Sequence, residues 1–138
     1  MLCGACEGLH HVVERGEFWK LAINRNQNLL GKSMLVLNHH REHVSELTPE
    51  EWAALHPYVT RVTAALDGLF APDRYNLAFL MNLDVHVHLH VVPQNASPRE
   101  WRGETYVDTH FGSLFGTEQR LVPEETLNAL TDTVSERL

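Results

Sequence analysis

The sequence has no long hydrophobic run and no recognisable export signal. No stretch of about 18 consecutive apolar residues exists, so we expect no membrane-spanning helix and no membrane partner. The first residues, MLCGACEGLHHVVERGEF, lack the basic flank and the apolar core of a signal peptide. Together these absences predict a cytoplasmic protein.

Basic residues are also scarce. The chain has 11 Lys and Arg against 18 Asp and Glu, a formal net charge of -7. A surface that follows a nucleic acid polymer needs an excess of Lys and Arg, so we expect no such partner. A small anionic ligand is compatible with this charge, because a few donors and backbone N–H groups are enough to bind a phosphate.

Internal repeats and low-complexity segments are absent too. The 138 residues are 43% hydrophobic, which is enough for one ordinary core and too little for two. We therefore expect a single domain over residues 1–138.

The spacing of apolar residues, and the positions of Gly, Pro and polar turn residues, predict strands that follow one another in sequence and only two long helices. The central helix begins at the N-cap Thr48 and Pro49 and repeats apolar residues at helical spacing. The expected strands span residues 17–24, 33–37, 74–82 and 84–92, with a short one in 103–108, and the C-terminal helix spans 123–138. Short connections favour an antiparallel sheet, so we predict an α+β fold with about five strands and both helices on one face.

Three histidines alternate with apolar residues in the stretch DVHVHLHVVPQ, residues 84–94. Successive side chains of a β-strand point to opposite faces, and the strand rises by about 3.3 Å per residue. His86, His88 and His90 are therefore expected on one face, about 6 to 7 Å apart. Imidazole is the usual acid–base group and a common metal ligand, so this face is the candidate site of chemistry.

The stretch HVHLHVVP resembles the signature of the histidine triad family, whose members are nucleotide hydrolases and transferases. WKLAINRNQNLLGKSMLVL resembles the N-terminal hairpin of that family, and HHREHVSELTPEE resembles the loop before its main helix. Within the family the chain is most similar to the bacterial diadenosine polyphosphate hydrolase-like branch. The resemblance covers residues 1–105.

This resemblance implies a nucleotidyl hydrolase or transferase that acts on the α-phosphate of dinucleoside polyphosphates or nucleoside phosphoramidates. His88 would attack the phosphorus and form a nucleotidyl-histidine, which water hydrolyses to release a nucleoside monophosphate. The backbone carbonyl of His86 would orient His88, and His90 would stabilise phosphate charge or help the leaving group depart. No organic cofactor is implied.

Two asparagines are candidate substrate-binding residues. Asn24 matches the family position that binds the ribose, although it also suits a turn, and Asn82 is a candidate phosphate donor. The chain departs from the family at Lys32, where relatives often carry His, and at Gln94, where Arg is common. It also lacks a Gly-rich hairpin before the histidines. These departures leave the substrate identity open.

Cysteine and histidine are concentrated near the N-terminus and after the second predicted strand, at Cys3, Cys6, His39, His40 and His43. A tetrahedral zinc site takes four nitrogen or sulfur ligands and commonly includes a C-x-x-C pair. The family resemblance implies a structural zinc held by Cys3, Cys6, His40 and His86. His10 and His11 are alternative ligands, and two buried thiols without a metal are the alternative interpretation.

Two other functions compete with the nucleotidyl hydrolase. The three histidines could hold one catalytic metal ion, although residues spaced along a flat strand lie too far apart to reach one ion without bending. The chain could also be a nucleotide-binding protein that has lost turnover.

The central helix predicts a homodimer. Trp52, Leu55, Tyr58 and Val59 give its start more large apolar surface than one sheet face needs, and the family pairs through this helix and an adjoining strand. The alternative is a monomer in which the C-terminal helix covers the same surface.

Overall fold

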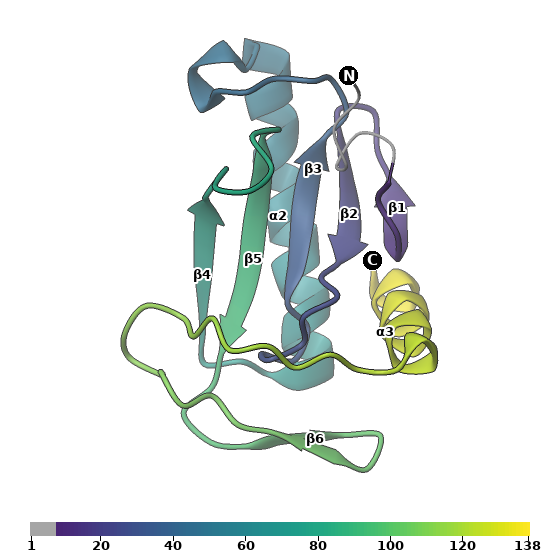
Figure 1. Cartoon of the computed structure of the whole chain (residues 1–138). Helices are drawn as coiled ribbons and strands as arrows, with labels where there is room; N and C mark the ends of the chain where they lie inside the picture. The colour runs from purple at the N-terminus through teal and green to yellow at the C-terminus, as the bar shows by residue number, and fades with distance from the viewer. Residues whose placement is uncertain (1–7) are drawn as a thin grey trace.

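The structure is a computed structural model that describes residues 8–138, and it contains one five-stranded antiparallel sheet (Figure 1). The strand order is β1-β2-β3-β5-β4, with β4 and β1 at the two edges. The strands are β1 (Val12–Arg15), β2 (Trp19–Ile23), β3 (Ser33–Leu37), β4 (Arg74–Phe79) and β5 (His88–Gln94). With the two helices described next, this architecture confirms the predicted α+β fold.

Helix α2 (Pro49–Phe70) runs along one face of the sheet, behind the strands in Figure 1. Its start follows the predicted signals, because the side chain of Thr48 accepts a hydrogen bond from the Glu51 N–H at 3.1 Å. Its end is set by Ala71, whose φ of 46° takes the chain into the left-handed region. Apolar residues at helical spacing, Leu55, Val62 and Leu66, form the core with the sheet.

Helix α3 (Glu124–Arg137) packs on the same side, against β1, β2 and α2. It contributes Leu127, Leu130 and Val134 to the core. In Figure 1 it lies near β1, at the opposite side of the sheet from β4. Helix α3 therefore leaves the α2 surface beside β4 uncovered.

Several details differ from the prediction. Strand β1 was not predicted, and neither was β6 (Arg99–Trp101), which pairs with the expected β7 (Glu104–Tyr106) through a turn at Arg102 and Gly103, both with positive φ. A short 3₁₀ turn, η1 (Val44–Glu46), precedes α2. Strand β5 begins at His88, so only two of the three histidines lie within it.

The length and the apolar character of a helix decide whether it can cross a bilayer. Within residues 8–138, neither long helix combines the length and apolar character that crossing a membrane requires.

Candidate active site

The sheet face opposite α2 carries His88 and His90. In β5 the alternate residues Leu89 and Val91 point into the core with α2, so the two histidines point the other way. His88 pairs across the sheet with Val36 of β3, and His90 pairs with Met34. We call this surface the triad face.

A backbone carbonyl fixes the state of the His88 ring. His88 Nδ1 lies 2.7 Å from the carbonyl oxygen of His86. A carbonyl oxygen only accepts, so Nδ1 carries the hydrogen and donates it. In the neutral ring Nε2 then has a free lone pair, which is the state that a nucleophilic imidazole needs.

His90 is the immediate neighbour of that lone pair. Its Nε2 lies 3.1 Å from His88 Nε2, and the two rings meet edge to face with centroids 4.7 Å apart. Because His88 Nε2 has no hydrogen, His90 Nε2–H is the donor of this contact. The other ring nitrogen of His90, Nδ1, is buried and has no hydrogen-bond partner in the described part of the chain.

Burial keeps His90 neutral. Burial lowers the pKa of His90 to about 4, and His88 and Lys32 contribute in the same direction. At neutral pH the His90 ring is therefore neutral, and its Nε2–H faces Nε2 of His88. A phosphate group that entered between the two rings would meet both a nucleophile and a donor.

A cavity of about 310 Å³ opens beside the two histidines. Asn82 lines it together with Leu80, Leu83 and Asp84. Sequence reasoning missed Asp84, whose carboxylate accepts a hydrogen bond from the backbone N–H of His86 at 3.1 Å. This contact shapes the bend just before β5.

Asn24 does not line this cavity. It follows β2, and its side-chain oxygen accepts a hydrogen bond from the Asn26 N–H at 2.9 Å, which is the geometry of an Asx turn. The turn thus engages the side chain that the family resemblance assigned to ribose binding. The ribose role of Asn24 has no support from this geometry and stays a prediction.

The two departures at Lys32 and Gln94 have local partners. The buried Lys32 ammonium donates to the Asn28 side-chain oxygen at 3.1 Å, and burial lowers the pKa of Lys32. The Gln94 amide donates to the Ser113 carbonyl at 3.0 Å, which ties the segment after β7 to the end of β5.

A second histidine pair lies just before β5. His86 meets His40, with their Nδ1 atoms 3.0 Å apart and ring centroids 5.1 Å apart. His86 Nε2 donates to the Leu37 carbonyl at 2.6 Å, so its Nδ1 is the ring nitrogen without hydrogen. Burial lowers the pKa of His86, which keeps the ring neutral and able to bind a metal.

Backbone contacts hold these two rings together. The residue after His40, Arg41, accepts a hydrogen bond at its carbonyl from the N–H of Val87, the residue after His86, at 2.9 Å. The Arg41 side chain donates to Glu51 of α2 at 2.9 Å, and Glu51 is only 2% exposed. The loop that carries His40 is therefore anchored both to the histidine stretch and to the helix.

The donor set of this pair fits a zinc ion. Two imidazole nitrogens bound to one tetrahedral zinc at about 2.0 to 2.1 Å lie roughly 3.3 Å apart, close to the observed separation. A metal-binding histidine usually donates its other N–H to a carbonyl or carboxylate. Leu37 provides this acceptor for His86, and Glu42 lies 3.7 Å from His40 Nε2.

The remaining candidate ligands are two cysteines and four further histidines. Cys3 and Cys6 fall outside the described residues, and residues 8–138 contain no cluster of three or more metal-binding side chains. His11 pairs with Glu124 of α3 at 3.1 Å, while His10, His39 and His43 are exposed. Of the histidines in the described chain, His40 is thus the one that meets His86. His86, His88 and His90 do not converge on a single metal position.

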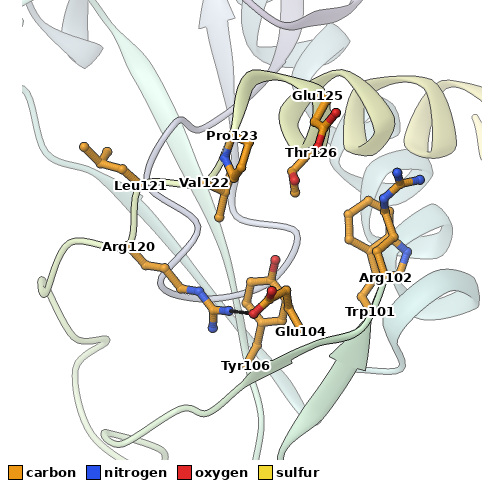
Figure 2. Close-up of a pocket in the computed structure, with 10 residues that line it drawn as sticks. All are labelled: Trp101, Arg102, Glu104, Tyr106, Arg120, Leu121, Val122, Pro123, Glu125 and Thr126. Atoms are coloured by element: carbon orange, nitrogen blue, oxygen red, sulfur yellow. Dashed lines mark hydrogen bonds and ion pairs between the residues drawn. The ribbon is translucent and has the colours of Figure 1, made fainter.

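A larger cavity, of about 380 Å³, lies between the β6–β7 hairpin and the start of α3 (Figure 2). Figure 2 shows Arg120 beside Tyr106 and Glu104, and the Arg120 guanidinium lies 3.8 Å from the centre of the Tyr106 ring. Neither a histidine nor a cysteine lines this cavity. The cavity beside His88 and His90 is therefore the candidate active site.

Known proteins resemble this chain in structure. No family profile matches the sequence, and no curated protein matches it. The solved structures give clear matches. A histidine triad protein from Sinorhizobium meliloti 1021 has a TM-score of 0.75 at 22% identity, covering 100% of this chain and 96% of that chain.

Two further structures carry more specific descriptions. The diadenosine triphosphate hydrolase of Plasmodium falciparum has a TM-score of 0.67 at 14% identity, covering 91% of this chain and 74% of that chain. A Zn-bound histidine triad family protein from Mycobacterium smegmatis has a TM-score of 0.62 at 17% identity, covering 91% and 84%. The chain therefore has the histidine triad fold, as its H-x-H-x-H sequence predicted.

Proposed function

We propose that the protein is a nucleotidyl hydrolase or transferase that uses His88 as its nucleophile. The observation that carries this proposal is the 2.7 Å hydrogen bond from His88 Nδ1 to the His86 carbonyl, which leaves Nε2 free beside a cavity. The likeness to the Plasmodium hydrolase supports a dinucleoside polyphosphate as substrate. Nucleoside phosphoramidates are the second substrate class.

In the first step His88 Nε2 attacks the α-phosphorus. The N–P bond forms as the bond from phosphorus to the leaving oxygen or nitrogen breaks, and the electron pair departs with the leaving group. The His88 ring gains positive charge, which the His86 carbonyl stabilises through the Nδ1–H bond. Water then attacks the nucleotidyl-histidine and releases a nucleoside monophosphate and the neutral ring.

His90 donates its N–H to the phosphate. Without substrate this N–H faces His88 Nε2 at 3.1 Å, so a bound phosphate oxygen replaces the lone pair as its acceptor. The donor stabilises the negative charge that develops on phosphorus oxygens in the transition state. Asn82, at the rim of the same cavity, is positioned to donate a further hydrogen bond.

A zinc ion held by Cys3, Cys6, His40 and His86 is the proposed structural element. The 3.0 Å separation between the Nδ1 atoms of His40 and His86 supports this proposal. With four protein ligands the ion is closed to substrate, so its role is to fix the N-terminal residues to the sheet. No chemical step uses it.

The function is tested by incubating the protein with diadenosine triphosphate in ¹⁸O-labelled water and identifying the products by mass spectrometry. The proposal predicts one labelled AMP for each substrate consumed, since water attacks the nucleotidyl-histidine. Binding without any product would instead favour a nucleotide-binding protein that lacks turnover. A chelator that stops turnover at once, without unfolding the protein, would favour a catalytic metal.

We also propose a symmetric homodimer that forms along β4. Of the residues expected at the interface, Tyr58 is buried in the core of the chain itself, whereas Leu55 is largely buried there and also lines the groove described next. The exposed apolar groove of about 340 Å³ lies between α2 and the edge strand, and its lining includes Trp52, Val59 and Leu77. A strand edge beside an apolar groove favours pairing with a second copy.

The dimer is tested by sedimentation at micromolar concentration. The native chain of 15.7 kDa should sediment with twice this mass. Leu77→Asp should shift it to the monomer, because Leu77 is 48% exposed and its replacement changes only the proposed interface. Leu121→Asp, at an exposed position away from the groove, is the control and should stay dimeric. A native protein with the mass of one chain would contradict the dimer.

A further inference from the structure

We propose that Lys20, assisted by Arg15, forms a subsite for the phosphate groups of the substrate that lie beyond the reacting one. The inference rests on the proposed function and narrows it to substrates with a polyphosphate chain. It concerns a row of side chains across the triad face, from β1 to the nucleophile on β5.

The row follows from the register of four strands. Arg15 of β1 pairs with Lys20 of β2, Lys20 pairs with Val36 of β3, and Val36 pairs with His88 of β5. Directly paired residues point to the same face of a sheet. The neighbours of Lys20 in β2, Trp19 and Leu21, belong to the core on the α2 side, so Lys20 points to the triad face.

The charge of Lys20 has no partner among residues 8–138. Lys20 is only 6% exposed, yet its ammonium forms no hydrogen bond or ion pair in the described residues. The ammonium is also absent from the fully buried polar atoms that lack a partner, so it reaches the surface while its stem is buried. Arg15 is exposed and likewise makes no ion pair within residues 8–138.

Most other cations of the chain are neutralised or stacked. Ion pairs with carboxylates are formed by Arg25, Arg41, Arg61, Arg99 and Arg120. Arg74 and Arg102 lie over aromatic rings. In an acidic protein with 18 Asp and Glu, two unpaired cations side by side on the triad face are an exception. A bound anion would compensate both charges.

The separation between Lys20 and His88 suits a substrate with several phosphates in a row. Two strand spacings of about 4.8 Å place the Lys20 and His88 backbones roughly 10 Å apart. The four-carbon stem of a lysine carries its ammonium about half of that distance. Lys20 can therefore contact a phosphate next to the one that His88 attacks.

The chemical consequence is a preference for substrates with several phosphates. A dinucleoside polyphosphate carries further negatively charged phosphates on the leaving-group side of the reacting α-phosphorus, whereas AMP and a nucleoside phosphoramidate carry a single phosphate. Charge-assisted hydrogen bonds from Lys20 and Arg15 stabilise only the longer chain. During transfer the two residues hold the leaving nucleotide and exchange no proton with it.

The subsite is tested by calorimetric titration of the His88→Asn protein, in which binding is measured without turnover. The ligands are diadenosine triphosphate and AMP. Adding Lys20→Gln should weaken binding of diadenosine triphosphate by about 10- to 100-fold and binding of AMP by less than about threefold. Lys20→Arg should keep the native affinity, and Arg15→Gln should cause a smaller loss than Lys20→Gln.

The matched control is Arg102→Gln, which removes one positive charge on the β6–β7 hairpin and should change neither affinity. An equal loss for both ligands, or unchanged binding of diadenosine triphosphate in Lys20→Gln, would overturn the subsite while leaving the proposed function intact. Failure of both nucleotides to bind any of these proteins would overturn the proposed function as well.

Discussion

Two histidine pairs lie next to each other at the start of β5, and their ring nitrogens are almost equally close. His40 and His86 meet at 3.0 Å, and His88 and His90 meet at 3.1 Å. The pairs differ in what lies behind the rings. Behind the first pair are the Leu37 carbonyl and the Glu42 carboxylate. Behind the second pair only His88 has an acceptor, and His90 Nδ1 is buried without one among the described residues.

This difference decides the chemistry of each pair. In the first pair the outer N–H of His86 donates to the Leu37 carbonyl and the Glu42 carboxylate lies 3.7 Å from His40 Nε2, a set of groups that suits two metal-binding imidazoles. In the second pair one inner nitrogen presents a lone pair and the other presents a hydrogen. Under the proposed function, the same side chain at nearly the same spacing would serve as a metal ligand in one pair and as nucleophile and donor in the other.

The largest effect is expected from the substitution His88→Asn in the second pair. The asparagine amide can still donate to the His86 carbonyl, so the fold should persist while the nucleophile is lost. We expect turnover of diadenosine triphosphate to fall by about 10⁴-fold or more, with unchanged thermal stability. Steady-state kinetics and thermal unfolding provide the two readouts. Turnover within a few-fold of the native protein would show that His88 is not the nucleophile.

His90→Asn should have a smaller effect, because it removes one contribution to charge stabilisation and leaves the nucleophile in place. We expect a loss of about 10²- to 10³-fold in kcat. The pre-steady-state rate of adduct formation separates this step from hydrolysis of the adduct. If His90→Asn were as inactive as His88→Asn, the distinct roles within the pair would be wrong.

His40→Ala tests the first pair. The variant should lose bound zinc and unfold about 10 °C lower, equivalent to roughly 3 kcal/mol, while folded molecules keep their turnover within a few-fold. Elemental analysis and thermal unfolding give the answer, and His39→Ala, at an exposed neighbouring position, is the control. Native protein purified under reducing conditions without any metal would refute the zinc site.

The smallest expected effect is a pH dependence of stability that belongs to His90. Its pKa is about 4 in the folded protein and about 6.5 in an unfolded chain, so below pH 6.5 the unfolded state binds the proton first. The contribution of His90 to the free energy of unfolding is fully present above pH 6.5 and is lost as the pH falls toward 4. Because His90 is partly exposed, we expect a loss of only about 1 kcal/mol at pH 5.

Urea unfolding of the native protein and His90→Asn at pH 7 and pH 5 measures this loss. The native protein should lose about 1 kcal/mol more than the variant between these two values. Equal losses in the two proteins would show that His90 titrates normally in the fold.

Local signals in the sequence predicted much of the fold. The predicted strand over residues 33–37 coincides with β3, and the helix signals at Thr48 and Pro49 place the start of α2 correctly. The start of the histidine strand was wrong. Asp84 accepts the His86 N–H, so the backbone bends there and the ladder begins only at His88. Strand periodicity carries no information about such a side-chain contact.

The candidate site was likewise predicted only in part from the sequence. The spacing of the three histidines placed His88 and His90 on one face, but the distinction between His39, His40 and His43 depends on the contact between Arg41 and Val87. Helical spacing likewise identified Leu55 as apolar without showing that it packs inside its own chain. Lys20 was missed, although a lysine within an otherwise apolar strand was a visible signal.

The proposed function requires that His88 carries the nucleotide during turnover. The most direct test is a rapid-quench reaction with ³²P-labelled substrate at alkaline pH, where phosphoramidate bonds survive, followed by peptide mapping. The account predicts a labelled AMP adduct on the peptide that contains His88, formed and lost at rates consistent with turnover, and absent in His88→Asn. Rapid product release with no adduct on this peptide, or an adduct that persists in His88→Asn, would contradict it.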